Sequence, residues 1–289
     1  MRKTTILLVC SALLLAVSCK KDDDSTDSGP PRLVFKFQFD STQTRLNNFG
    51  QIAVMPAGHA AQSPRFNSIS AHYIELTQSE FVLPGNGEVL FQGSETTAGG
   101  DMAINFDQAK IVAEGAEFFS MPIPLSQVAP GSYEWLRVSL SYQNYEIDFR
   151  ALGFDTTATV ASFVGYNNYI TSHTIKDSTI IVDGNRLQGF WAFETAFNVV
   201  SGQAPPGATT VPNPIFANSP IPQGSCLVTG RFPNNLVITG SETEDVIVTI
   251  SLSTNNSFEW IDNGDGIFEP LAGDVVVDMG LRGMIPLVE

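Results

Sequence analysis

The sequence predicts an all-β protein, built as an antiparallel β-sandwich. Apolar residues recur at every second position in many short segments, which is the period of a half-buried strand. Turn-forming Gly, Pro, Asn and Asp residues separate these segments. No amphipathic stretch with the 3.6-residue period of a helix extends beyond about ten residues. Many short strands with such turns favour a sandwich, either as one unit or as two packed β units.

Alternation is clearest near the start of the body and again in two later segments. Within residues 33–40, apolar side chains occupy every second position: Leu33, Phe35, Phe37 and Phe39. Residues 246–253 repeat this pattern. In residues 136–142 the pattern predicts one apolar face made of Leu136, Val138, Leu140 and Tyr142. Further strands are expected over residues 69–76, 87–92, 103–112, 158–164, 175–182, 187–199, 226–232, 235–239 and 274–279.

Composition divides the chain into five segments. Residues 1–18 form a signal peptide and 19–31 a flexible tether. Residues 32–199 form a β-sandwich body. Residues 200–224 are rich in Pro, which cannot donate to a strand ladder, and are expected to form a long loop or a linker. Residues 225–289 supply C-terminal strands that pack on the body, because so short a segment is marginal as an independent core.

The N-terminus carries the strongest localisation signal in the chain. Basic Arg2 and Lys3 precede an apolar run from residue 6 to 17, too short to span a bilayer. Small residues then lead into Cys19. This order resembles the signal peptide and lipobox of bacterial lipoproteins, which implies that Cys19 carries the lipid and becomes the mature N-terminus. An ordinary secretory signal, with Cys19 a bystander, is the alternative.

The residues after Cys19 indicate on which side of the membrane the protein is displayed. Lys20-Lys21-Asp22-Asp23-Asp24 resembles the export signal of surface lipoproteins in Bacteroidota, a Lys followed by acidic residues. The resemblance implies display on the outer face of the outer membrane, held there through the N-terminal lipid. Attachment facing the periplasm and a merely solvated tether remain the alternatives.

Charge and cysteine content exclude several functions. The formal net charge of −15 becomes about −17 once Arg2 and Lys3 are removed with the signal, so nucleic acid is a poor partner. Of three cysteines, only Cys226 stays free after signal cleavage and lipidation, so the mature chain forms no internal disulfide. We expect Cys226 to be buried as a small apolar side chain.

One acidic loop is the best candidate for a metal site. Asp262, Asp265 and Glu269 lie in a Gly-containing segment, and clustered carboxylates on a flexible backbone suit Ca²⁺. Asn-Gly and Asp-Gly pairs in the same segment equally predict a β-hairpin without metal. No cofactor is certain from the sequence, and Ca²⁺ is the candidate that this loop suggests.

Aromatic and amide residues give a candidate ligand site. Sugar rings stack on aromatic faces, and amides bond their hydroxyl groups. The side chains that could form such a platform are Trp135, Tyr142, Asn144, Tyr145 and Trp191. Alternation also places Trp191 and Phe193 on one strand face, where they would simply be core.

The histidines His59, His72 and His173 offer a copper or zinc alternative. The order of Phe35-Lys36-Phe37, His72-Tyr73-Ile74-Glu75-Leu76 and Pro130-Gly131-Ser132-Tyr133 is similar to the MbnP-like exported β proteins associated with copper. That resemblance covers the first half of the body and assigns no ligand residue.

No phosphate-binding loop, zinc-protease motif or nucleophile elbow occurs. We therefore expect an outer-membrane surface lipoprotein with a non-enzymatic binding or structural role toward a glycan or a protein partner. A metal-binding lipoprotein is the alternative and a glycan-active hydrolase the third class.

Overall fold

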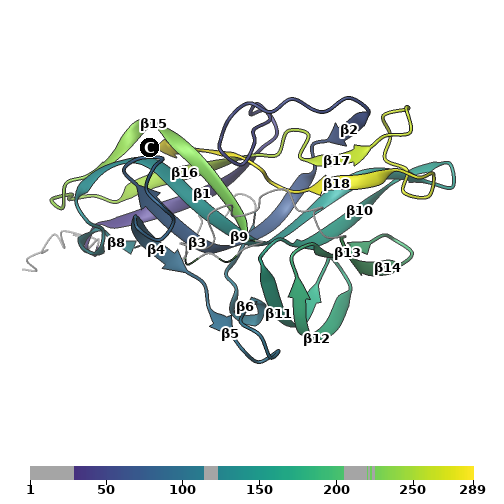
Figure 1. The fold of residues 1–289 in the computed structure, drawn as a ribbon, viewed down its shortest axis with the longest axis horizontal. Helices are drawn as coiled ribbons and strands as arrows, with labels where there is room; N and C mark the ends of the chain where they lie inside the picture. Colours follow the sequence, from purple (N-terminus) through teal and green to yellow (C-terminus); the bar gives the residue numbers. More distant parts are fainter. Residues whose placement is uncertain (1–28, 114–122, 205–219, 221, 223–224) are drawn as a thin grey trace, which may run out of the picture.

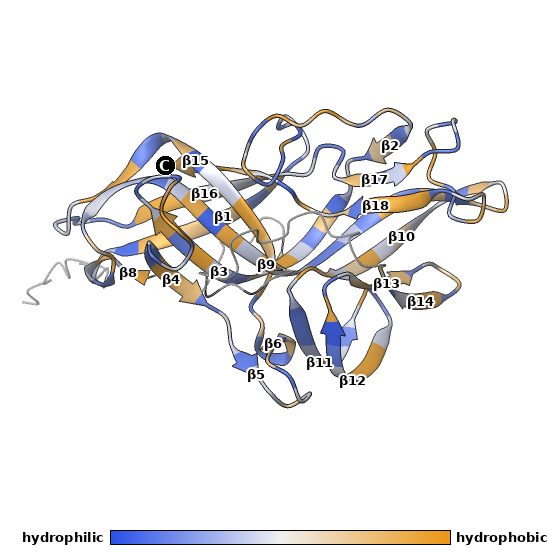
Figure 2. Ribbon diagram, viewed as in Figure 1, coloured by the Kyte–Doolittle hydropathy of each residue, from blue (hydrophilic) through white to orange (hydrophobic). Residues whose placement is uncertain are grey.

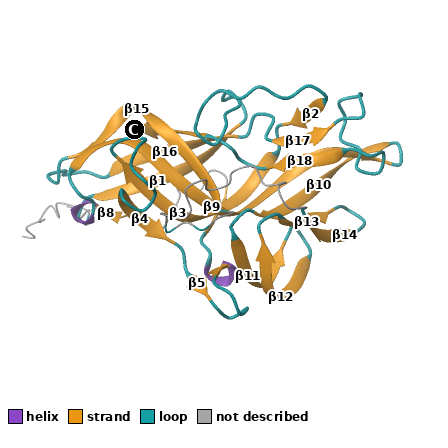
Figure 3. Ribbon diagram, viewed as in Figure 1, coloured by secondary structure: helices purple, strands orange, loops and turns teal. Residues whose placement is uncertain are grey.

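The structure, a computed structural model, describes residues 29–113, 123–204, 220, 222 and 225–289. Within these ranges the chain is all-β, which confirms the predicted fold class (Figure 3). The predicted signal peptide, Cys19, the Lys20–Asp24 run and most of the Pro-rich segment lie outside the described residues. No helix in the described part is long and apolar enough to cross a membrane.

The strands are short except for a few that run through the centre (Figure 1). In the first half they are β1 (Arg32–Asp40), β2 (His59–Gln62), β3 (Arg65–Thr77), β4 (Glu88–Gln92), β5 (Glu95–Thr96), β6 (Ala103–Asn105), β7 (Ile111–Ala113), β8 (Ile123–Pro124) and β9 (Gly131–Ala151). In the second half they are β10 (Phe154–Phe163), β11 (Asn167–Thr174), β12 (Thr179–Leu187), β13 (Phe190–Glu194), β14 (Val199–Gln203), β15 (Cys226–Ile238), β16 (Val246–Ser253), β17 (Phe258–Ile261), β18 (Val275–Met279) and β19 (Met284–Val288). Two 3₁₀ helices complete the set, η1 (Phe106–Gln108) and η2 (Leu125–Gln127).

A central sheet organises the molecule. Its strands follow the order β14-β13-β10-β9-β3-β4, with β15 also paired to β9 and β7 to β3. Three smaller sheets accompany it: β19-β16-β1-β8, β18-β17-β2 and β12-β11-β6-β5. Polar and apolar residues are interspersed along the strands (Figure 2), as the pleat of a half-buried sheet requires.

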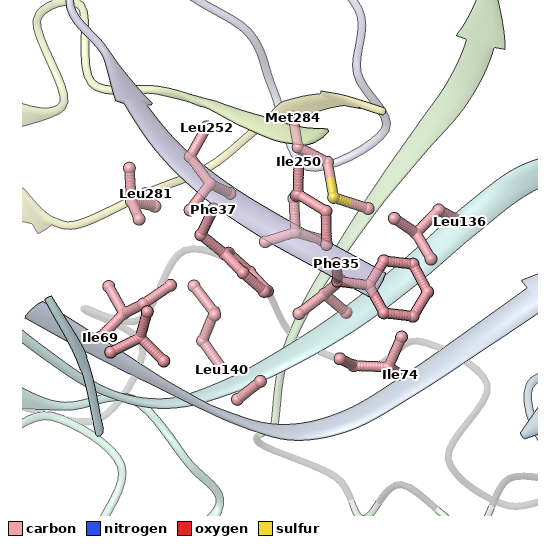
Figure 4. Close-up of a cluster of buried hydrophobic side chains, with 14 of the residues drawn as sticks. Phe35, Phe37, Ile69, Ile74, Leu136, Leu140, Ile250, Leu252, Leu281 and Met284 are labelled. Atoms are coloured by element: carbon pink, nitrogen blue, oxygen red, sulfur yellow. The ribbon is translucent and has the colours of Figure 1, made fainter. Parts of the chain in front are cut away.

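One face of the central sheet, here called the inner face, is closed by the main hydrophobic core. Figure 4 shows Phe35 and Phe37 of β1 packed with Leu136 and Leu140 of β9. At the other end of the same core, Trp260 of β17 is 1 % exposed. Two sheets stacked with their apolar side chains between them make the sandwich, and the predicted alternation in residues 33–37 is confirmed.

The opposite face, here called the outer face, carries a smaller core. Phe163 of β10 and Phe190 of β13 pack with Ile170 of β11. This second cluster fills only part of the space between the central sheet and the β12-β11-β6-β5 sheet, and a cavity occupies the neighbouring part.

The C-terminal strands are woven into the body rather than set apart from it. Strand β15 pairs with β9 in the central sheet, and β16 pairs with β1. The β1–β16 pair is parallel, as is the β6–β11 pair, so the fold is mostly rather than wholly antiparallel. Strand β14 occupies the start of the segment expected to be a Pro-rich loop from residue 200.

Strand β9 changes face in its middle. Its pairing with β3 runs from Leu140 directly to Tyr142, because Ser141 is the extra residue of a β-bulge. Leu136, Val138 and Leu140 therefore face the main core, whereas Tyr142 joins the outer cluster. The prediction that all four share one face was wrong, because alternation alone does not reveal the extra residue.

Several predicted strands are longer than the strands in the structure. Residues 103–112 form β6, η1 and β7 rather than one strand. Residues 175–178 form the turn between β11 and β12, and the expected strand over 187–199 is interrupted twice. Conversely, residues 226–232 and 235–239 belong almost entirely to one strand, β15, which contains an irregularity between Arg231 and Leu236.

Candidate ligand-binding cavity

A cavity of about 700 Å³ lies against the outer face, which places it in the size range of small-ligand sites. Strands β3 and β9 form its floor, and η1 and β11 contribute its walls. Its lining mixes aromatic, amide and charged side chains, among them Asn67, Phe106, Tyr142, Asn144, Glu146 and His173.

The bulge at Ser141 determines which residues of β9 line the cavity. After the extra residue Ser141, the positions 142, 144 and 146 alternate onto the outer face, so three successive side chains of one strand enter the cavity wall. A second irregularity, at Asn67 of β3, lies opposite them, because Phe66 pairs with Tyr145 and Ser68 with Asn144. Bulges of this kind often re-aim side chains next to functional sites.

Asn144 holds the floor of the cavity together. Its amide nitrogen donates to the Tyr142 hydroxyl at 3.1 Å and to the carbonyl of Ile175 at 2.8 Å. Its amide oxygen accepts a hydrogen bond of 2.8 Å from the Asn67 side chain. Both N–H donors and the oxygen of the Asn144 amide are thus hydrogen-bonded within the protein. Asn144 therefore has a structural role in the cavity floor.

His173 is a buried polar side chain in the cavity wall. It is 4 % exposed, and neither ring nitrogen has a hydrogen-bond partner among the described residues. Its ring meets Phe163 edge-on at 5.1 Å between centroids. Burial lowers the pKa of His173 to about 4, so at neutral pH the ring is uncharged and offers one donor and one acceptor.

Charged side chains at the rim of the cavity already bond to other groups of the protein. Glu146 lies 2.7 Å from the Lys176 ammonium, and this hydrogen bond is the main reason that the pKa of Glu146 is lowered. Asp107 of η1 accepts hydrogen bonds from the backbone N–H and the hydroxyl of Thr171. Both carboxylates keep further lone pairs toward solvent and ligand, so the cavity is rich in acceptors.

The predicted ligand residues divide between the cavity and elsewhere. Tyr142 and Asn144 line the cavity. Tyr145 is fully buried in the main core, where its hydroxyl donates to the carbonyl of Met279. Trp135 and Trp191 are half-buried and lie outside the cavity, so the five side chains form no common platform.

Sequence reasoning missed the cavity residues Asn67 and Glu146, and it considered His173 only as a possible metal ligand. The alternation of residues 142, 144 and 146 was a usable signal for Glu146. Nothing local marks Asn67 or His173, because they reach the site through a bulge and through a separate sheet.

The acidic loop after β17 binds its own backbone. Asp262 accepts hydrogen bonds from the N–H groups of Gly264 at 3.0 Å and Gly266 at 3.1 Å. Asp265 caps Ile267 at 3.0 Å. The loop joins the antiparallel strands β17 and β18, as in the hairpin alternative. Among the described residues, no group of three or more His, Cys, Asp or Glu side chains is arranged to hold a metal ion, so Asp262, Asp265 and Glu269 do not converge.

The three histidines occupy three separate surroundings. His59 contacts Glu259, a 2 % exposed carboxylate that also pairs with Arg45. His72 lies beside Glu95 at 3.2 Å, and His173 lies in the cavity wall. The described structure therefore does not gather them into the copper or zinc set considered from the sequence.

Comparison of this chain with protein-family models, with curated proteins and with solved structures finds no match. The chemistry of the cavity must therefore be read from its own residues.

Proposed function

We propose that this protein is an exported lipoprotein, anchored through Cys19 at the cell surface, that binds a carbohydrate in the cavity on the outer face. The anchor is supported by the basic start, the short apolar run and the lipobox-like approach to Cys19. The acidic run that follows supports the outward orientation. The role proposed is capture of a ligand without chemical change to it.

The observation that carries the ligand proposal is the unpartnered His173 in a cavity of about 700 Å³. A buried polar group without a partner costs on the order of 1–3 kcal/mol. A ligand hydroxyl group can donate to one imidazole nitrogen, and a second can accept from the other. A bound polyol therefore gives the ring nitrogens of His173 hydrogen-bond partners and removes this cost. An apolar ligand leaves both nitrogens without partners.

The remaining lining fits the same ligand class. Asp107 and Glu146 offer carboxylate oxygens to hydroxyl donors, while Phe106 and Tyr142 offer apolar ring surface. The two rings contact each other, with 5.0 Å between their centroids and 51° between their planes. Because Lys176 balances only one of the two carboxylates, anionic ligands are disfavoured at this site.

Binding is tested by glycan-array screening of the protein followed by calorimetry with the best neutral sugar. We expect Ser68→Trp, which places a large ring in the cavity lining, to abolish binding. The matched control is Ser132→Trp at an exposed position of β9, which should bind as the unaltered protein does. Absence of any neutral glycan ligand, or equal loss in both variants, would contradict the carbohydrate proposal.

The anchor is tested separately. Expression with a labelled fatty acid should label the protein, and Cys19→Ser should lose the label and leave the membrane fraction. Protease treatment of intact cells then reports orientation, because a surface-displayed body is degraded without lysis. A labelled protein that is protected in intact cells would place the body on the periplasmic side.

A further inference from the structure

A second, smaller cavity of about 180 Å³ lies beside the first and shares Ala109 with it. It is lined by residues of β3, β4 and β6 and by the chain that follows η1. At about 30 Å³ per water molecule, it has room for roughly six waters, which suits a small ion of a few heavy atoms rather than a sugar ring.

His72 is the buried titratable group in this lining. The residue is skipped in the pairing of β3 with β9, since Ala71 pairs with Leu140 and Tyr73 with Ser139. It is 1 % exposed, and its Nδ1 atom has no hydrogen-bond partner among the described residues. An occupant of the cavity is the natural partner for that atom.

The other nitrogen of His72 has a defined neighbour. Nε2 lies 3.2 Å from Oε1 of Glu95, and the Tyr166 hydroxyl donates to the same oxygen at 3.1 Å. The neighbouring His72 ring is the main cause of the lowered pKa of Glu95, which keeps this carboxylate charged at neutral pH. Neither ring nitrogen of His72 has a hydrogen-bond partner among the described residues, but the nearby charge of Glu95 favours a proton on Nε2 and leaves Nδ1 for an occupant of the cavity.

The lining of the smaller cavity differs in charge from that of the larger one. Among the described residues that line it there is no carboxylate, although the chain as a whole has a net charge of −15. Lys110 supplies an ammonium group, which lies 6.0 Å from the ring centroid of Phe91, another lining residue. Hydroxyl and amide groups complete the polar lining, from Ser94, Asn105, Gln108 and Ser141. The described lining therefore offers a counter-charge to an anion and none to a cation.

We propose that the smaller cavity is a binding site for one small oxyanion, held by the Nδ1–H of protonated His72 and by the Lys110 ammonium. A carboxylate and an inorganic phosphate share this chemistry, and the experiment below separates them. The site is independent of the carbohydrate proposed for the larger cavity.

Binding takes up one proton. The three titratable groups around His72 are Glu95 at Nε2, Tyr166 behind Glu95, and Lys110 on the cavity lining. Because Glu95 supports the imidazolium and the bound anion adds a second negative neighbour, protonation and anion binding assist each other. Affinity should therefore be higher at lower pH.

The experiment is calorimetric titration of the full chain with sodium acetate and, separately, sodium phosphate, at constant ionic strength set with chloride. One of the two should bind saturably, more tightly at pH 6 than at pH 8. Titration in two buffers of different ionisation enthalpy should show uptake of a proton. If neither anion binds beyond the chloride control, the cavity holds water and the proposal is wrong.

Substitutions of Lys110 and His72 test whether these residues form the anion site. Lys110→Met should weaken anion binding at least about tenfold, the effect of losing one charged hydrogen bond. Its matched control, Lys176→Met at the rim of the larger cavity, should leave anion binding unchanged. His72→Gln should abolish both binding and proton uptake. Should that variant fail to fold, the ¹⁵N resonance of His72 in the unaltered protein must still shift on anion addition. Equal weakening in both Lys variants, or an unmoved resonance, would overturn the assignment.

Discussion

The two faces of the central sheet use neighbouring residues of the same strand for opposite purposes. On the inner face, Tyr145 is fully buried and its hydroxyl is satisfied by the Met279 carbonyl. On the outer face, Tyr142 is almost as buried, yet it borders a cavity whose His173 lacks partners. The strand is continuous between them, and because they are three positions apart, the alternation of side chains places them on opposite faces.

This difference indicates where binding can be sought. Two sheets close over the inner face, and the Tyr145 hydroxyl finds its hydrogen-bond partner within the protein there. The outer face is covered by a sheet that packs on it through a smaller apolar cluster, and both cavities lie there. The largest mutational losses of stability should therefore come from the inner face, and losses of binding from the outer one.

The first prediction concerns the inner face. Tyr145→Ala should destabilise the protein by about 3–5 kcal/mol, since it opens a hole in a closed core. Tyr145→Phe, which removes only the hydroxyl, should cost about 1 kcal/mol. Urea denaturation measures both values. Carbohydrate binding by the molecules that remain folded should be unchanged, and a selective loss of binding would break the division between the faces.

The sequence predicted the inner face well and the outer face poorly, for a physical reason. Phe35 and Phe37 show their burial through strict alternation, because one side of their strand meets the core along its whole length. The outer face depends on bulges at Asn67, His72 and Ser141, and each adds a residue without changing the local composition. The parallel β1–β16 pair joins residues more than 200 positions apart, which no local pattern reveals.

The second prediction concerns the outer face and its pH dependence. Burial lowers the pKa of His173 from 6.5 to about 4, so between these values the unfolded chain binds a proton that the folded chain does not. Stability should therefore be constant above about pH 6.5 from this source and fall as the pH drops toward 4. The full loss amounts to about 3 kcal/mol.

Unfolding free energies of the unaltered protein and of His173→Gln, measured from pH 7.5 to 4, isolate this contribution. The difference between the two curves should change over the window from about 6.5 to 4 and be flat above it. A difference that is constant across the whole range would show that the imidazole exchanges protons freely with solvent, and that the cavity is wetter than its lining indicates.

The third prediction tests the loop beyond β17, at the end of the inner face. Asp262→Ala removes the acceptor for the N–H groups of Gly264 and Gly266 and should cost about 1–2 kcal/mol. The cost should be the same in calcium and in chelator, because the carboxylate serves the backbone. Thermal unfolding in both conditions measures it. A gain of stability in calcium that Asp262→Ala abolishes would favour the metal interpretation of this loop instead.

The smallest expected effect lies where β9 turns back into β10, beyond both cores. Leu152 and Gly153 form a two-residue hairpin loop with φ values of 51° and 82°, between the paired residues Ala151 and Phe154. Positive φ at both positions is the type I′ geometry, which favours Asn-Gly and strains a leucine. Because Leu152 is 86 % exposed, its side chain contributes little packing in return. Leu152→Asn should thus stabilise the protein by about 0.5–1 kcal/mol without altering ligand binding at either cavity. Urea denaturation checks the gain, and a loss of stability would mean that the leucine packs against its neighbours in solution more than its exposure indicates.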